Sequence, residues 1–221
     1  MSGYVYNGPS TKIQTRQTTA LAAPGATQIG FVVDQSGSME SVKSETVNGF
    51  NKLLAEQKGS PREAALSLAL FNERVRLVHD AVPIADVPLL SHELYVPAGG
   101  TALNDGIGYM IQAIGKRASR LTPVLVVILT DGLDTSSSQF SAADVRQMIA
   151  YRRLNHDWEF LFLGPRSGLG YAASIGIPED HVFGFEADSK GITRILDRLS
   201  ASLEAYRLGD RQYTLLLKGR E

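Results

Sequence analysis

Five oxygen-bearing side chains stand in three separate short segments of this 221-residue chain. Asp34, Ser36 and Ser38 belong to the run FVVDQSGSM, Thr101 belongs to PAGGTAL, and Asp131 belongs to ILTDGLD. Hydroxyl and carboxylate oxygens suit small, hard divalent ions such as Mg²⁺. If the fold brings the three segments together, they predict an all-oxygen binding site for such an ion.

Each segment taken alone has a simpler interpretation. Asp-x-Ser-Gly-Ser after a strand is typical of a turn in which Ser38 caps the next helix, and the other two segments are ordinary loop sequences. The conjunction favours a shared site, because two of the three segments end predicted buried strands. Asp134, three residues after Asp131, is expected to cap the helix that follows rather than to join the site.

Alternating strand and helix patterns predict the scaffold that positions these residues. Continuous apolar runs at 29–34 and 124–130 indicate strands buried on both faces. Two further strands are expected at 159–163 and 182–185. Apolar residues at helical spacing predict five helices, over 41–57, around 107–114, and over 142–151, 171–174 and 192–203.

Residues 64–71 and 75–79 are joined by only three residues, which cannot hold a crossover helix, so we expect an antiparallel hairpin at the sheet edge. The whole pattern predicts an α/β fold: a doubly wound, mostly parallel sheet with helices on both faces and one antiparallel edge strand. In such sheets ligands bind beyond the carboxyl ends of the strands, where the strand order reverses. Asp34 and Asp131 close the two most apolar strands, so both are expected at that point.

Composition narrows the classes of function. With 22 basic and 23 acidic residues and a net charge of -1, the chain offers no basic tract, and we expect no nucleic-acid partner. Cysteine is absent, which excludes disulfides, thiolate zinc sites and cysteine nucleophiles. The longest apolar run, 124–129, is too short to span a bilayer, and the first residues lack the apolar core of a signal peptide. A cytoplasmic location without a membrane span is therefore expected.

One domain is expected, because a chain of this length with 43% hydrophobic residues can form one large core. We place this domain at residues 25–207. A polar, turn-rich N-terminal arm is expected over 1–24 and a C-terminal tail or added strand over 208–221.

Taken together, DQSGSM, GGTAL and ILTDGLD resemble the metal-ion-dependent adhesion site of the von Willebrand factor A family, and most closely its small stand-alone bacterial and phage-type members. The resemblance covers about residues 27–205. It implies that Ser36, Ser38 and Thr101 bind Mg²⁺ directly through their hydroxyls. Asp34 and Asp131 would act through bound water and by orienting those hydroxyls. Mn²⁺ and Ca²⁺ are the alternative ions.

The resemblance also implies a function without catalysis. The cation would bind a Glu or Asp carboxylate of a partner protein, as in other members of the family. Because hydroxyls are uncharged, they leave much of the cation's charge available to an incoming anion. The stand-alone bacterial members further suggest an adaptor that works with an AAA+ ATPase or another multiprotein complex.

An Mg²⁺-dependent hydrolase or a nucleotide-binding protein that uses the same sheet edge is the alternative function. Residues 168–173 fit the pattern GxGxxA, and Glu186 follows the next predicted strand, as in a dinucleotide fingerprint. However, Pro165, Arg166 and Ser167 separate the preceding strand from the first glycine. The glycines are therefore interpreted as loop residues.

Two further enzyme classes fit poorly. A phosphotransferase with Asp34 as nucleophile would place a second acid two residues later, where the chain has Ser36. Acyl transfer by Ser36 or Ser167 would need a positioned base. The chain has no GxSxG motif, and none of its four histidines stands in a catalytic motif: His79, His92, His156 and His181.

Overall fold

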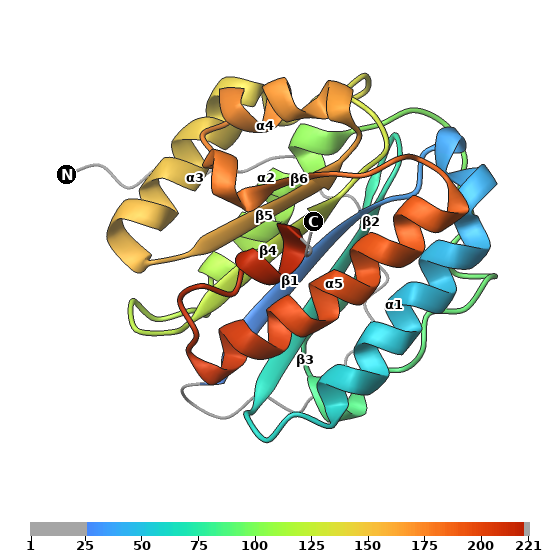
Figure 1. The fold of residues 1–221 in the computed structure, drawn as a ribbon. Helices are drawn as coiled ribbons and strands as arrows, with labels where there is room; N and C mark the ends of the chain where they lie inside the picture. Colours follow the sequence, from blue (N-terminus) through green and yellow to red (C-terminus); the bar gives the residue numbers. More distant parts are fainter. Residues whose placement is uncertain (1–25, 219–221) are drawn as a thin grey trace.

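A single sheet of six strands forms the centre of the computed structural model, which describes residues 26–218 (Figure 1). The strand order is β3-β2-β1-β4-β5-β6, and among the described pairs only β2 and β3 run antiparallel. The predicted α/β fold with a mostly parallel, doubly wound sheet and an antiparallel edge strand is confirmed. The strands are β1 Thr27–Asp34, β2 Ala64–Phe71, β3 Val75–Pro83, β4 Val124–Leu129, β5 Glu159–Gly164 and β6 Val182–Gly184.

Helices cover both faces of the sheet. In Figure 1, α1 and α5 lie side by side across one face, and α2, α3 and α4 cover the other. The α-helices are α1 Lys43–Lys58, α2 Leu103–Gly115, α3 Ala142–His156, α4 Leu169–Ser174, α5 Ser189–Leu208 and α6 Leu215–Lys218. Short 3-10 helices are η1 Gly37–Val42, η2 Ile84–Asp86, η3 Arg166–Gly168 and η4 Glu179–His181.

Strand β1 shows why these residues form a central strand. Every residue of it is buried, and successive side chains alternate between the two cores. Phe31 belongs to the core under α1 and α5, whereas Val32 belongs to the core under α2 and α3. Burying each such side chain contributes about 1.5–3 kcal/mol. Gly30 allows α2 to approach the sheet closely, since a Cβ there would lie 2.8 Å from Ile114 Cδ1.

Several element boundaries differ from the sequence prediction by a few residues, mostly at the ends of helices. The helix predicted from residue 41 begins earlier, as η1, and becomes α-helical at Lys43. Helix α3 runs five residues past the predicted end, to His156. Its last turns are rich in polar residues and show no apolar period, so periodicity could not mark where the helix ends.

The chain after α5 folds back onto the domain. Tyr213 and Leu217 are buried, and the Ser202 hydroxyl donates to the Tyr213 carbonyl at 2.9 Å. The part of the predicted tail described here, as far as Lys218, thus contains the short helix α6 and no strand. The predicted arm at 1–24 lies outside the described residues. Between residues 26 and 218, no helix combines the length and apolarity needed to cross a bilayer.

Candidate functional site

The strand order reverses between β1 and β4. Strand β1 pairs with β2 on one side and with β4 on the other, and the chain leaves β1 and β4 at the same edge of the sheet. Asp34 is the last residue of β1, and Asp131 follows the end of β4 by two residues. Both carboxylates therefore lie at the switch point where the sequence placed them.

A chain of hydrogen bonds joins four of the five predicted residues. Asp34 Oδ1 accepts from the Ser36 backbone N–H at 2.7 Å. The hydroxyls of Ser36 and Ser38 lie 3.1 Å apart, and Ser38 Oγ donates to Asp131 Oδ1 at 2.7 Å. Neither η1 nor α1 has a side-chain hydrogen bond at its N-cap, and the Ser38 hydroxyl bonds to Asp131, so it serves the cluster and is not a helix cap.

Thr101 reaches the same place from the connection before α2. Its carbonyl accepts from the backbone N–H groups of Thr135 at 2.8 Å and Ser136 at 3.1 Å, which ties it to the segment that carries Asp131. A Cβ built at Gly132 would lie 3.8 Å from Thr101 Oγ1. Within the described residues this hydroxyl makes no hydrogen bond, so its lone pairs are free for a ligand.

The electrostatics of the cluster suit a cation. Asp34 is 0% exposed, and burial raises the pKa of its carboxyl group. Hydrogen bonds from Thr130 and Ser36 oppose that rise, and the nearby charge of Asp131 adds to it. Among residues 26–218, no Lys, Arg or His forms an ion pair with either carboxylate. Two acids are thus held together without a protein cation, and one of them is fully desolvated.

The donor set also indicates what kind of ion fits. It offers only hydroxyl and carboxylate oxygens, which favours Mg²⁺ or another hard ion over zinc. No group of three or more His, Cys, Asp or Glu side chains in the described part of the chain could hold a metal. A cation bound here would therefore depend on Ser36, Ser38, Thr101 and water in addition to the two carboxylates.

Two residues that the sequence analysis missed hold Asp34 in place. Thr130 Oγ1 donates to Asp34 Oδ2 at 2.6 Å. The fully buried Tyr95 donates its hydroxyl to the Asp34 carbonyl, also at 2.6 Å. Thr130 could have been suspected from its place beside Asp131. No sequence pattern indicated a role for Tyr95, because it stands 61 residues from Asp34 in a connection without periodic apolar residues.

Asp105, in the first turn of α2, was also missed. Its carboxylate accepts three backbone hydrogen bonds from the loop before α3, at 2.8–2.9 Å. Ser138, Gln139 and Phe140 are the donors. The side chain is buried, so this carboxylate locks the loop that follows Asp131 to the helix that follows Thr101.

Asp134 has the capping role that the sequence suggested, but on a different helix. It accepts from the Asn104 backbone N–H at 3.1 Å, at the start of α2 and not of the following helix α3. Ser141 caps α3, through a capping box with Asp144. Asp134 was assigned to the wrong helix because α2 is adjacent only in the folded chain.

The glycine-rich segment departs from the dinucleotide pattern in its local structure. Its helix, α4, has six residues, and a Cβ at Gly170 would meet no atom within 4 Å, so no close approach requires that glycine. Glu186 is exposed and lies 3.7 Å from Arg166. Tyr171 instead donates its hydroxyl to Asn104 Oδ1 at 2.6 Å and so braces the start of α2.

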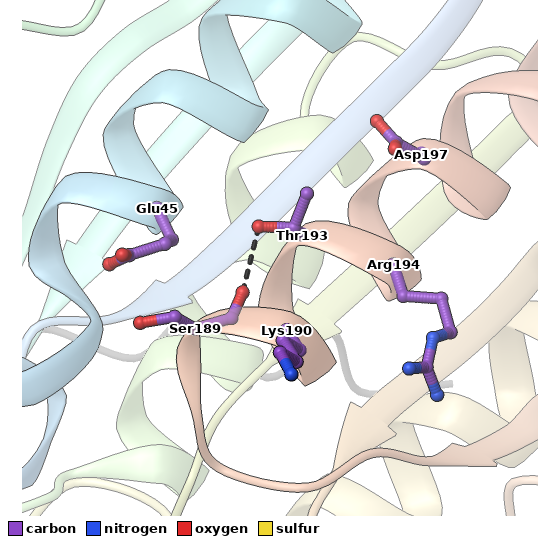
Figure 2. Close-up of a pocket in the computed structure, with 6 residues that line it drawn as sticks. All are labelled: Glu45, Ser189, Lys190, Thr193, Arg194 and Asp197. Carbon is purple, nitrogen blue, oxygen red and sulfur yellow. Dashed lines mark hydrogen bonds between the residues drawn. The ribbon is translucent and has the colours of Figure 1, made fainter.

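A separate hollow of about 470 Å³ lies between α1 and the start of α5 (Figure 2). Figure 2 shows charged side chains of both signs around it, including Glu45 and Arg194. Thr193 Oγ1 donates to the Ser189 carbonyl at 2.7 Å, which is a contact within α5. None of the five clustered residues lines this hollow. The sheet edge, and not this hollow, carries the candidate chemistry.

Comparison with known proteins agrees with this geometry. A sequence profile of the von Willebrand factor type A domain matches residues 28–156, more than half of the chain. No curated protein matches the sequence.

Several solved structures share the fold. Proximal thread matrix protein 1 from the mussel byssus is 19% identical, with a TM-score of 0.59 over 80% of this chain and 45% of that chain. A von Willebrand factor type A protein from Catenulispora acidiphila is 16% identical, with a TM-score of 0.59 over 82% and 43%. The vWF domain of the type V pili tip protein Mfa5 from Porphyromonas gingivalis is 12% identical, with a TM-score of 0.61 over 86% and 98%. The present chain thus spans less than half of the first two proteins, and at these identities the likeness concerns the fold.

Proposed function

Because this chain belongs to the von Willebrand factor type A family, whose domains commonly mediate protein–protein interaction, we propose that it binds a protein partner through a divalent cation. The cation is Mg²⁺, with Mn²⁺ or Ca²⁺ as alternatives, and the partner supplies a Glu or Asp carboxylate. The observation that carries this proposal is the hydrogen-bonded group of Asp34, Ser36, Ser38 and Asp131 without a protein counter-ion.

The five residues would hold the ion in two different ways. Ser36, Ser38 and Thr101 would offer neutral hydroxyl oxygens, and Asp34 and Asp131 would balance charge through water and through the hydroxyls that they already contact. When bound, the cation supplies a Lewis-acidic position for an anionic oxygen. Because three of the five ligands are neutral, the site keeps an attraction for one more carboxylate.

The surrounding residues hold these ligands in place before a partner arrives. Tyr95 and Thr130 fix the two sides of Asp34, and Asp105 fixes the loop after Asp131. Ligands that are already ordered lose little conformational entropy on binding, which favours affinity.

Calorimetry with Mg²⁺ and Mn²⁺ tests the metal site directly. We expect the wild type to titrate and Asp34→Ala to give no binding heat, because that substitution removes the only fully buried carboxylate of the cluster. Asp86→Ala is the matched control, since Asp86 is exposed on η2, away from the sheet edge. Equal binding heats for the wild type and Asp34→Ala would disprove the assignment of the metal site.

Partner binding is tested by affinity pull-down with Mg²⁺ and with EDTA. A partner retained only with Mg²⁺, and lost in both Asp34→Ala and Ser38→Ala, is the expected result. Equal retention of the partner with EDTA and with Mg²⁺ would contradict binding through a cation. An AAA+ ATPase among the retained proteins is the specific expectation for the adaptor role.

The enzyme alternative makes a different prediction at the same edge. A hydrolase should turn over a member of a phosphoester or nucleotide panel in the presence of Mg²⁺ and lose that turnover in Asp34→Ala. Such a result would replace the binding function proposed here.

A further inference from the structure

Two strongly exposed leucines lie at the opposite end of the sheet, in the connection before β4 and at the end of α3. Leu121, in the loop between α2 and β4, is 90% exposed, and Leu154, in the last turns of α3, is 83% exposed. They are the most exposed large apolar side chains in the described part of the chain, and Tyr151, one turn before Leu154 in α3, is 56% exposed. Figure 1 shows the end of α3 near the start of β4, at the end of the sheet where β4 and β5 begin side by side.

Basic side chains at this end lack a partner of opposite charge. The Arg152 guanidinium group lies over the Trp158 ring at 4.7 Å and beside the Tyr151 ring at 5.6 Å. Within residues 26–218, neither Arg152 nor Arg120 forms an ion pair or a side-chain hydrogen bond. The half-buried Arg152 is held by the two rings and by the backbone of α2 at Gly115, where a Cβ would lie 2.0 Å from its Nη2 atom. Its N–H groups make no hydrogen bond to the described residues.

Two further donors in the same place are unsatisfied. The indole N–H of Trp158 is buried without an acceptor, and His156 Nδ1 is buried without a partner. The His156 ring lies 5.4 Å from the Tyr151 ring. Partial burial, and then the charges of Arg152 and Arg120, lower the pKa of His156, so the local potential is positive. The Trp158 and His156 nitrogen atoms are both buried and out of reach of a docking segment, so the half-buried Arg152 and the exposed Arg120, in a positive potential, are what favour an anionic acceptor.

We propose that this patch, made of Arg120, Leu121, Tyr151, Arg152, Leu154 and His156, docks an acidic and apolar segment of a protein. A Glu or Asp carboxylate of that segment would accept from Arg152 and Arg120, and an adjacent apolar side chain would cover Leu121 and Leu154. This goes beyond the proposed function, because it needs no cation and lies at the other end of the sheet. The domain could then hold acidic groups at both ends.

An acidic peptide fits the patch better than a nucleic acid. Nucleic-acid backbones are bound by several cations spread along a groove, whereas the chain has a net charge of -1 and this patch combines two guanidinium groups with two exposed leucines. Apolar anchors flanked by a charged group are typical of peptide-binding surfaces.

A peptide array tests the proposal on the full chain. The labelled protein is applied, in EDTA, to synthetic peptides that combine Glu or Asp with Leu, Phe or Trp at different spacings, and to counterparts with Lys in place of the acids. We expect acidic peptides to be retained and the lysine counterparts not. Retention of no acidic peptide, or equal retention of both sets, overturns the proposal.

Fluorescence anisotropy with the best peptide then locates the contact. Arg120→Glu should raise the Kd about tenfold, and its fold should be intact because Arg120 has no partner to lose. Arg194→Glu is the matched control, since Arg194 is an exposed arginine of α5 at the hollow in Figure 2, and it should bind as the wild type does. Leu154→Glu provides a second variant with the same expected loss.

The remaining outcomes separate this patch from the metal site. Unchanged affinity in both Arg120→Glu and Leu154→Glu overturns the proposal, as does stronger binding of a single-stranded oligonucleotide than of any peptide. Asp34→Ala should bind the peptide normally in EDTA. Binding that requires Mg²⁺ would assign the peptide to the sheet edge with Asp34, which would refute the patch and support the proposed function.

Discussion

The two ends of the sheet carry opposite charges that the fold leaves unpaired. At the carboxyl ends of β1 and β4, Asp34 and Asp131 lie together without a protein cation. At the amino ends of β4 and β5, Arg152 and Arg120 form no ion pair with a carboxylate of residues 26–218. Charge that is desolvated and unpaired destabilises a fold. Each end is therefore a place where an oppositely charged ligand would increase stability.

The two ends differ in how their side chains are held. Hydrogen bonds from Tyr95, Thr130 and Ser36 fix Asp34 on three sides. Arg152 is held by ring stacking on Trp158 and Tyr151, which constrains distance more than direction. The first arrangement suits a small ion with strict geometry, and the second suits a side chain that can adjust.

Binding of Mg²⁺ should stabilise the wild type and not Asp34→Asn. At free Mg²⁺ of about one hundred times the Kd, linkage adds about 2.7 kcal/mol to the free energy of unfolding, which thermal denaturation with and without EDTA can measure. Arg120→Glu should keep the full response, because it changes only the other end. A similar Mg²⁺ response in Asp34→Asn would show that the ion binds elsewhere.

Asp105→Ala should destabilise the chain by about 2–3 kcal/mol, because three backbone N–H groups in part-buried hydrogen bonds lose their charged acceptor. Urea denaturation measures the loss, with the exposed Asp86→Ala as control. Since Asp105 fixes the loop after Asp131, affinity for Mn²⁺ should fall as well. A stability loss without any change in Mn²⁺ affinity would mean that the loop is not preorganised for the ion.

Tyr95→Phe removes one hydroxyl that donates to the Asp34 carbonyl and should lower the free energy of unfolding by about 1 kcal/mol. Tyr213→Phe is the matched comparison, because the Tyr213 hydroxyl is buried without a partner, and its removal should be neutral or stabilising. Chemical denaturation of the two variants checks this. Equal effects would indicate that the hydrogen bond to Asp34 contributes nothing.

The pKa of His156 should lie below the ordinary histidine value of about 6.5, and the pKa of His181 should lie above it. Burial and two arginines lower the pKa of His156. Burial also acts to lower that of His181, but hydrogen bonds to Glu159 and Asp180 outweigh it and leave the pKa raised. NMR titration of the ring protons measures both values, and Arg120→Glu should raise only that of His156.

The stability effects of the two histidines have opposite signs. The contribution of His181 is complete below its unfolded pKa and is lost as pH rises through its raised folded pKa. That of His156 is present above its unfolded pKa and is lost as pH falls through its lowered folded pKa. An unchanged pKa of His156 in Arg120→Glu would argue that the arginine is remote from the ring and would weaken the case for one basic patch.

Local patterns were enough to predict most of the scaffold. The buried runs of β1 and β4 and the hairpin of β2 and β3 follow from the apolar pattern and the connection length. Both features involve only residues close together in the chain. The same patterns placed Asp34 and Asp131 at one sheet edge. Their binding of a metal stays a prediction, as do the cytoplasmic location and the identity of the partner.

Contacts between distant segments could not be predicted in this way. Tyr95 reaches Asp34 across 61 residues, and Asp105 reaches its three donors across 33–35 residues. Asp134 was assigned to the wrong helix for the same reason. Such contacts depend on which loops meet after the sheet has formed. Patterns over a few neighbouring residues do not predict which loops these are.

By itself, the sequence determined the strand and helix pattern, the sheet class and the five oxygen-bearing residues, because each of these depends on neighbours close in the chain. Tertiary structure alone decided that Ser38 bonds to Asp131, that Asp34 is fully desolvated, and that Arg152 stacks on Trp158 without a carboxylate. Burial and charge pairing depend on everything that packs around a group. The unpaired charges at the two ends of the sheet therefore became visible only in the folded chain.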